Sequence, residues 1–365
     1  MSSTVEFVSL EIADFRPFGG TQTFVFARPR VAGQSALTVI TGDCGSGKSS
    51  LIATLMLALW GTRLSLSHSA ACRSPVFCSG DPFAKAGNYV NADALHRSHR
   101  TARVTLTLSI DGGGAEPATT VINRTWRAST AGTVTESVRV ASSAAGQTVQ
   151  RCGSAAQATI SRLLPPRSLV RLFPDCELFE NLGRAVLPPP PAGDRVYRYS
   201  ALRSLVDSVS EPQWRAVAPA VIEFVNEVLS CDSERPCLRL LSEPAGRALV
   251  GALQIVPGVW ANFLPSCHTH LVCIGTTLAL GIALSGDPMA PFVLDAPAFR
   301  LPPIEGGLLL EALSESGCPQ IVVAAHECQI DDLALGLWHR AQRIYLVENP
   351  SEGRCALLSE PVAGR

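Results

Sequence analysis

Residues 42–49 read GDCGSGKS and fit the pattern G-x-x-x-x-G-K-[ST], which is typical of a loop that binds phosphate groups. Residues 36–40 before it form a β-branched run typical of a strand. Residues 50–59 after it form an apolar run typical of a helix. Because strand, glycine loop and helix follow in this order, the match is more than a chance string on a Gly/Ser-rich loop.

Each part of this loop has an expected role. Glycines let the backbone curl so that its N–H groups point at phosphate oxygens, and the helix N-terminus adds partial positive charge. Lys48 is expected to reach the β and γ phosphates, and the Ser49 hydroxyl to complete a Mg²⁺ shell. The candidate nucleotide-binding residues are Gly42, Asp43, Cys44, Gly45, Ser46, Gly47, Lys48, Ser49 and Ser50.

The composition narrows the class of protein. Of the 365 residues, 17% are charged and 47% are hydrophobic, with a mean hydropathy of +0.22, which excludes a disordered or highly charged chain. The net charge of −1 gives no global attraction to nucleic acid or anionic lipid. The longest clean apolar run, residues 271–284, is too short to span a bilayer, which needs about 20 residues, and predicts a buried helix.

The cysteines and the N-terminal residues indicate in which cellular compartment the protein is expected. No signal peptide is visible at the N-terminus, and twelve cysteines without such a signal suggest reduced thiols. We therefore expect a cytoplasmic protein with no membrane partner. The segment from Cys267 to His270 lacks the usual spacing of metal ligands, so an ordinary loop is expected there rather than a metal site.

The rest of the chain predicts two lobes. In the first, residues 5–27 predict two strands around a turn, and residues 61–95 a long loop. Further strands are predicted at 102–110, 119–126 and 136–142, and a helix at 157–185. A proline run then breaks the chain, because it is stiff and cannot continue a helix. We expect an N-terminal lobe over 1–187, a linker over 188–194 and a C-terminal lobe over 195–365.

The second lobe supplies residues that complete a nucleotide site. Helices are predicted at 204–229 and 271–284, and strands at 291–295, 320–326 and 343–347. Asp295 ends an apolar strand, and an aspartate at this place holds Mg²⁺ in phosphate-loop proteins. The alternative is an ordinary strand-end aspartate that caps a turn before Pro297. His326 ends a second buried strand, which brings it to the same sheet edge.

In this order, the motifs resemble the ATPase heads of the ABC class found in SMC, RecF, RecN, SbcC and DndD proteins. The segments that carry the resemblance are 10–26, 42–61, 264–284, 291–301 and 322–327. DndD-like heads are the most similar, through residues 91–113, 122–128 and the segment around Phe173 to Glu177. The resemblance implies a P-loop NTPase of α/β class with ABC-head architecture: a mixed sheet with helices and an N-terminal antiparallel β subdomain.

The resemblance also implies an activity. ATP and Mg²⁺ would be the ligands, with Lys48, Asp295 and His326 catalytic and with Ser49 and Asp295 at the metal. Ser266 of one subunit would contact the γ-phosphate held by another, so a homodimer or a hetero-assembly through the nucleotide face is implied. Duplex DNA is the implied partner, in DNA repair, restriction or another DNA transaction.

Several departures from the family pattern affect this interpretation. No long coiled coil separates the lobes, and the signature beginning at Leu264 loses both glycines to Cys267 and His268. Ala296 stands where most such heads carry a catalytic glutamate, although DndD-like heads also lack it. The usual Q-loop glutamine is also missing, because no glutamine lies between Lys48 and Gln147, and Asn88 or Asn91 would be its weak substitute. Hydrolysis is therefore expected to be slow or partner-dependent.

Two basic clusters are candidates for contact with nucleic-acid phosphates. They consist of His96, Arg97, His99, Arg100 and Arg103, and of Arg162, Arg167 and Arg171. The alternative is a solvated surface with scattered salt bridges.

Three hypotheses stay open on the sequence. The first is an ATP-gated clamp that dimerises around two nucleotides and acts on DNA. The second is a degenerate head that binds ATP as a structural ligand and serves as a scaffold; Cys267, His268 and Ala296 favour it. The third is a small-molecule kinase, against which the long gap between Lys48 and Asp295 argues.

Overall fold

A computed structural model describes most of the first lobe and separate parts of the second. The described residues are 4–29, 35–43, 45–61, 89–112, 117–144, 147–165, 172, 211–229, 238–240, 253–255, 259–260, 271–272, 274–279, 290–295, 303–316, 318–325, 341–349 and 354–358. The predicted linker over 188–194 and the residues Cys44, Asn88, Ser266, Cys267, His268, Ala296 and His326 lie outside them.

The larger sheet has six strands, in the order β2-β1-β4-β5-β6-β7, and all of them come from the first 152 residues. Its strands are β1 (Thr4–Phe15), β2 (Phe18–Val25), β4 (Thr101–Asp111), β5 (Ala118–Ala128), β6 (Val134–Ala144) and β7 (Gln147–Cys152), and all neighbours are antiparallel. Apolar residues alternate with polar ones along β4 and β5, so one face of the sheet is buried and the other is polar.

A five-stranded sheet of order β11-β12-β3-β13-β14 holds the phosphate loop. Its strands are β3 (Ala36–Gly42), β11 (Phe292–Asp295), β12 (Gln320–Ala324), β13 (Gln342–Asn349) and β14 (Arg354–Leu358). All pairs are parallel except β13 with β14. Every residue of β3 and β12 is buried, as expected for central parallel strands.

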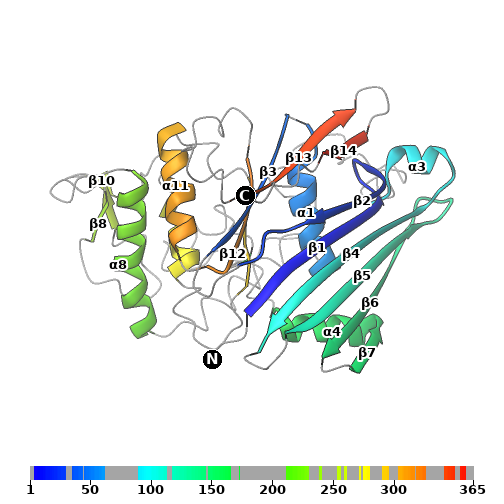
Figure 1. The fold of residues 1–365 in the computed structure, drawn as a ribbon, viewed down its shortest axis with the longest axis horizontal. Coiled ribbons are helices and arrows are strands. Elements are labelled where there is room, and N and C mark those ends of the chain that lie inside the picture. Colours follow the sequence, from blue (N-terminus) through cyan, green and yellow to red (C-terminus); the bar gives the residue numbers. More distant parts are fainter. Residues whose placement is uncertain are drawn as a thin grey trace, which may run out of the picture.

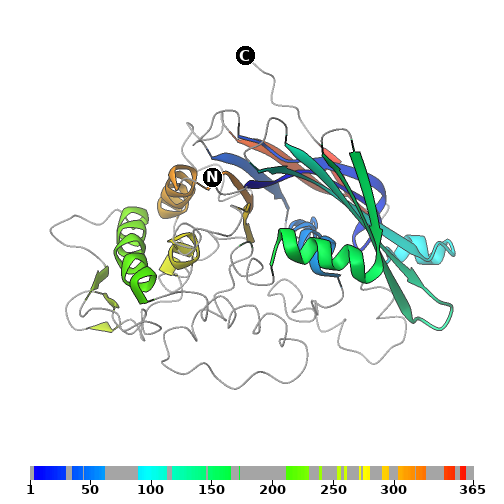
Figure 2. The same cartoon turned by 90° about the horizontal axis from the view of Figure 1, so that it is seen from below.

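Helix α1 (Lys48–Trp60) and helix α4 (Gly153–Leu163) lie on the same face of the six-stranded sheet (Figure 2). On the far side of the five-stranded sheet, α8 (Glu211–Val228) packs beside α11 (Pro303–Glu315) (Figure 1). A small three-stranded sheet adjoins α8 and contains β8 (Leu238–Leu240), β9 (Leu253–Ile255) and β10 (Val259–Trp260). No helix among the described residues is both long enough and apolar enough to cross a membrane.

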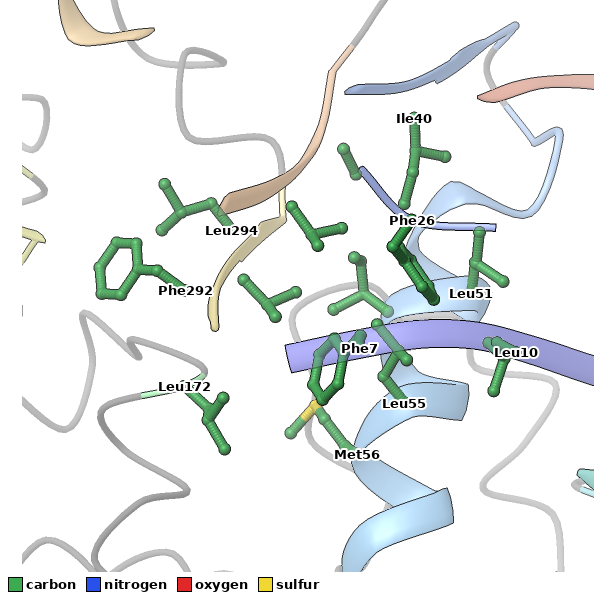
Figure 3. Close-up of a cluster of buried hydrophobic side chains, with 14 of the residues drawn as sticks. Phe7, Leu10, Phe26, Ile40, Leu51, Leu55, Met56, Leu172, Phe292 and Leu294 are labelled. Atoms are coloured by element: carbon green, nitrogen blue, oxygen red, sulfur yellow. The ribbon is translucent and has the colours of Figure 1, made fainter. Parts of the chain in front are cut away.

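One hydrophobic core connects the two larger sheets. Figure 3 shows Phe7 of β1 next to Leu55 and Met56 of α1, with Leu294 of β11 in the same cluster. All four side chains are at most 4% exposed. Since the cluster takes residues from near both ends of the chain, the sheets form a shared core rather than two separate ones.

Gln320 links the two sheets by three hydrogen bonds to backbone groups. Gln320, at the start of β12, is fully buried, and its Oε1 accepts from the backbone N of Phe7 at 2.7 Å. Its Nε2 donates to the backbone oxygens of Phe7 and Ala27 at 2.8 and 2.6 Å. This point of β1 carries a register shift between Phe7 and Ser9, so the glutamine serves backbone groups where the ladder is irregular.

The predicted fold class is confirmed, and so are the predicted strands of the first lobe. The prediction of a long loop over 61–95 is wrong at its end, where the short helix α3 (Ala92–His96) begins. The helix predicted over 157–185 starts earlier, at Gly153, and ends at Leu163, since Leu164 and Pro165 are not helical. Strands β7, β8, β9, β10 and β14 were not predicted. In the predicted helix over 271–284, the described residues 271–272 and 274–279 are helical and buried.

Replacing Gln320 with leucine should lower the free energy of unfolding by about 2–3 kcal/mol, because buried backbone groups of Phe7 and Ala27 lose their partner. Chemical denaturation measures the change. Gln342→Leu is the control: its Nε2 makes one exposed bond to the backbone oxygen of Val25, and its loss should cost less than about 1 kcal/mol. Equal effects of the two variants would contradict the structural role given to Gln320.

A pH dependence follows from the carboxylates of α8 and α11. Burial first, and then the neighbouring carboxylates of Glu315, Glu223 and Glu311, raise the pKa of Glu227 above its ordinary value of 4.5. The charged form is therefore unfavourable in the folded state above this raised pKa, and the penalty disappears as the pH falls through it towards 4.5.

Glu227→Gln should therefore raise the melting temperature at pH 7, and the gain should shrink as the pH falls through the raised pKa. Thermal melts across this pH range measure it. Glu11→Gln is the control, because it removes an exposed ion pair with Arg103 and should give no gain at pH 7. A Glu227→Gln gain that grows towards low pH would contradict the assignment.

Candidate functional site

The glycines of the loop at residues 42–49 adopt backbone conformations that other residues rarely reach. Gly42, Gly45 and Gly47 have φ angles of 137°, 89° and 95°. Gly42 also has no room for a side chain, because a Cβ there would overlap the backbone oxygen of Leu346 in the neighbouring strand β13. The glycine spacing in the sequence is thus a requirement of the loop's path between β3 and α1.

Among the described residues, no side chain caps the N-terminus of α1. Its N-cap is Gly47, no side chain accepts from the first amides, and the first turn contains no acidic residue. The positive end of the helix dipole is therefore not neutralised by the helix itself. The buried Ser46 hydroxyl beside it also finds no hydrogen-bond partner among the described residues. Such an arrangement is suited to an anion.

Lys48 is folded back over its own loop. Its Nζ donates to the backbone oxygens of Gly42 and Asp43, both at 2.6 Å, and the residue is 7% exposed. These carbonyls hold the ammonium group at the mouth of the loop. A bound phosphate would compete for the same donor, and a charge-assisted bond to phosphate is stronger than a bond to a neutral carbonyl.

Ser49 and Asp295 meet although 246 residues separate them. The Ser49 hydroxyl donates to Asp295 Oδ1 at 3.0 Å. They meet because β11, β12 and β3 run parallel, with Asp295 opposite Ala324, and Ala324 opposite Ile40. The carboxyl ends of these strands therefore share one edge of the sheet. A hydroxyl and a carboxylate are the hard oxygen donors that Mg²⁺ prefers, so this pair fits the predicted ion.

Three predicted site residues, Cys44, Ser266 and His326, lie outside the described residues. Strand β12 ends at Ala324, and Ala325 donates its N–H to the backbone oxygen of Ile40 at 2.9 Å, just before His326. The roles expected for these residues therefore stay predictions. Within the described ranges, no group of three or more His, Cys, Asp or Glu residues is placed to hold a metal by itself.

Asn91, a possible substitute for the missing glutamine, is already used by the fold. Its Oδ1 accepts from the backbone N of Asp93 and Ala94 at 3.0 and 3.3 Å, which caps α3. Its Nδ2 donates to the backbone oxygen of Arg16 at 2.7 Å. Because both ends of the amide hold backbone, the geometry argues against the nucleotide role expected for Asn91.

Part of the first basic cluster is neutralised by neighbouring acids. His99 Nδ1 lies 2.7 Å from Asp14 Oδ2, and Arg103 pairs with Glu11 at 3.0 Å. Arg100 donates to the backbone oxygen of Ser129 at 2.8 Å. This favours the alternative of a solvated surface with salt bridges for these residues. In the second cluster, Arg162 is exposed on α4, while Arg167 and Arg171 lie outside the described residues.

Arg124 lies at the C-terminal end of α1 and was not predicted from the sequence as a residue of interest. It is 2% exposed, and its guanidinium group bonds to the last turn of α1. One signal was present: Arg124 occupies an inward position of β5, between buried Ile122 and Trp126, where an apolar residue is expected.

Comparisons with known proteins agree with this architecture. A family model described as "AAA domain" matches residues 9–170. No curated protein is similar enough to match the chain. Solved structures with the same fold include an SMC head bound to the C-winged helix domain of ScpA, with 16% identity, a TM-score of 0.60 and 98% of each chain covered.

Two further structures show the same likeness. The SMC head domain from Thermotoga maritima is 16% identical with a TM-score of 0.51, over 98% of this chain and 100% of that one. The Smc head domain from Pyrococcus furiosus, with an extended coiled coil and bound to the C-terminal domain of ScpA, is 14% identical with a TM-score of 0.54, over 98% and 97%. The chain therefore has the P-loop NTPase fold of ABC type that these SMC head domains share.

Proposed function

We propose that this chain is an ATP-binding head that hydrolyses ATP slowly and uses the nucleotide to control association through its nucleotide face. The observation that carries the proposal is the meeting of three features at one sheet edge. These are the glycine loop, the buried Lys48 above it, and the Ser49–Asp295 pair from distant parts of the chain. A chance match to the phosphate-loop pattern has no reason to bring an aspartate to Ser49 from 246 residues away.

The residues divide the work of binding. Backbone N–H groups of the loop and the free end of α1 would hold the phosphates. Lys48 would exchange its two carbonyl partners for phosphate oxygens, and Ser49 with Asp295 would hold Mg²⁺. Held there, the ion would supply positive charge that stabilises the charged phosphate groups. His326, which follows β12 closely, would contact the γ-phosphate and report its presence.

Hydrolysis is expected to be weak because of Ala296. A methyl group cannot polarise the attacking water, which a glutamate does at this place in most ABC heads. The same residue supports the second candidate, in which ATP is a structural ligand of a scaffold. The resemblance to DndD-like heads, which also lack that glutamate, favours some residual turnover over none.

Two observations bear on the partners. Two of the similar SMC heads were solved bound to domains of ScpA, so a protein that docks on the head is a reasonable partner for this chain too. The proposal of duplex DNA as a partner rests on the resemblance, since His99 bonds to Asp14 and Arg103 pairs with Glu11, which reduces the basic patch. We therefore place a protein partner or a second copy of the head before DNA.

ATP turnover by the purified chain tests the proposal, with and without duplex DNA. Lys48→Ala should abolish ATP binding and turnover, because the ammonium group that reaches the phosphates is lost. Lys85→Ala is the control for loss of a lysine outside the loop, and it should behave as wild type. Turnover above the Lys48→Ala blank supports an ATPase, and stimulation by DNA supports the clamp. Binding without turnover supports the scaffold, and no binding contradicts both.

Association through the nucleotide face is tested separately at Ser266. Ser266→Arg places a long cation where the signature serine is expected to approach the partner's γ-phosphate, so ATP-dependent dimerisation should be lost while ATP still binds. Sedimentation with and without ATP measures the mass, and Ser266→Ala is the milder control. Dimers that form with ATP in the Ser266→Arg variant would exclude this geometry.

A further inference from the structure

The C-terminal end of α1 is closed by a buried cation from another element. Arg124 of β5 donates from Nε to the backbone oxygen of Ala58 at 3.1 Å and from Nη2 to that of Leu59 at 3.2 Å. Gln157 of α4 donates to the same Leu59 oxygen at 3.2 Å and accepts from Arg124 at 2.8 Å. Glu136 of β6 pairs with the Arg124 Nη1.

This end of the helix needs such partners. The last carbonyls of any helix have no hydrogen-bond donors within the helix, and the helix dipole places partial negative charge at this end. Helix α1 has no basic residue in its own last turn, so the compensating charge comes from β5. The packing is close enough that a Cβ at Gly61 would overlap both the Arg124 guanidinium and the Glu136 carboxylate.

Holding the C-terminal end of α1 in place also holds its N-terminal end, at the phosphate loop, in place. Helix α1 has 13 residues and is therefore about 20 Å long. It begins at Lys48, in the phosphate loop, and contacts both sheets. A helix packed on most sides moves as a rigid rod, so a slip at Leu59 shifts Ser49 relative to Asp295 on β11.

We infer that Arg124 is a positioning residue for the nucleotide site: by holding the last carbonyls of α1, it sets the axial position at which the loop and Ser49 face Asp295. The inference rests on the proposed function and deepens it. A role for Arg124, Gln157 and Glu136 in fold stability alone explains their hydrogen bonds less well. A buried ion pair can be replaced by apolar residues of similar volume with little loss of stability. What an apolar pair cannot reproduce is the directional hold on two helix carbonyls.

The test uses the full chain and a fluorescent ATP analogue with Mg²⁺, at a temperature below the melting transition of every variant. The double variant Arg124→Met with Glu136→Gln removes both charges and keeps most of the volume. If Arg124 positions the loop, the Kd for the analogue should rise about tenfold or more in the folded variant, because a small misplacement of the binding groups weakens binding strongly. Arg124→Lys keeps the charge and should recover part of the affinity.

Arg103→Met is the matched control. It breaks the Arg103–Glu11 ion pair on the same sheet, which does not bond to α1, and the Kd should stay within about twofold of wild type. A wild-type Kd in the folded double variant overturns the positioning role and leaves the proposed function intact. Failure of the wild-type chain to bind the analogue overturns both.

If the double variant does not fold, Gln157→Leu provides the same test more mildly, since it removes two bonds at this end of α1 and no charge. The Kd should rise, by less than in the double variant, and an unchanged Kd again overturns the inference.

Hydrogen exchange adds a second readout. ATP should slow exchange of the wild-type amides in the last turn of α1, since coupling between two sites is reciprocal. No change there with bound ATP counts against the inference.

Discussion

The burial of helix α1 between two sheets is the constraint on which the rest of the structure depends. All but two of its residues are buried, and it contacts β4 and β5 of the six-stranded sheet as well as β3, β11 and β12 of the five-stranded sheet. The helix therefore has no polar face and behaves as a core element. Since the phosphate loop leads directly into its first turn at Lys48, the packing that stabilises both sheets also fixes the position of the loop.

The backbone carbonyls at the C-terminal end of α1 have side-chain partners, whereas the backbone amides at its N-terminal end do not have a side-chain cap among the described residues. At the C-terminal end, Arg124 and Gln157 satisfy the carbonyls within the protein, with Glu136 balancing the charge. At the N-terminal end, no side chain of the described residues caps the amides, and the N-cap residue is a glycine. An uncapped helix N-terminus of this kind is suited to bind an anionic ligand. This asymmetry supports the proposed function independently of any comparison.

Much of this could be predicted from the sequence, because the deciding signals are local. The glycine spacing and the flanking strand and helix predicted the loop, and alternation predicted β4, β5 and β6. The approach of Asp295 to Ser49 was expected because an aspartate at the end of such a strand holds Mg²⁺ beside the loop in phosphate-loop proteins. The roles assigned to Ser266 and His326 remain predictions.

The failures have physical reasons. All six residues of β7 are exposed, so no alternation marks it, and α3 is only five residues long, with its cap residue Asn91 interpreted as a possible ligand. The bonds of Arg124 and Gln320 join residues distant in sequence, and no local pattern shows which partners a buried polar side chain will find. Such long-range contacts became visible only in the folded chain.

A crystal structure of the chain with a non-hydrolysable ATP analogue and Mn²⁺ in place of Mg²⁺ tests the central claim most directly. The Lys48 Nζ should leave the carbonyls of Gly42 and Asp43 for phosphate oxygens. An anomalous Mn²⁺ peak should lie within about 2.2 Å of the Ser49 hydroxyl, with Asp295 beside it or one water away. Nucleotide bound elsewhere, or a Lys48 that keeps its two carbonyl partners while the analogue is bound, would contradict the account.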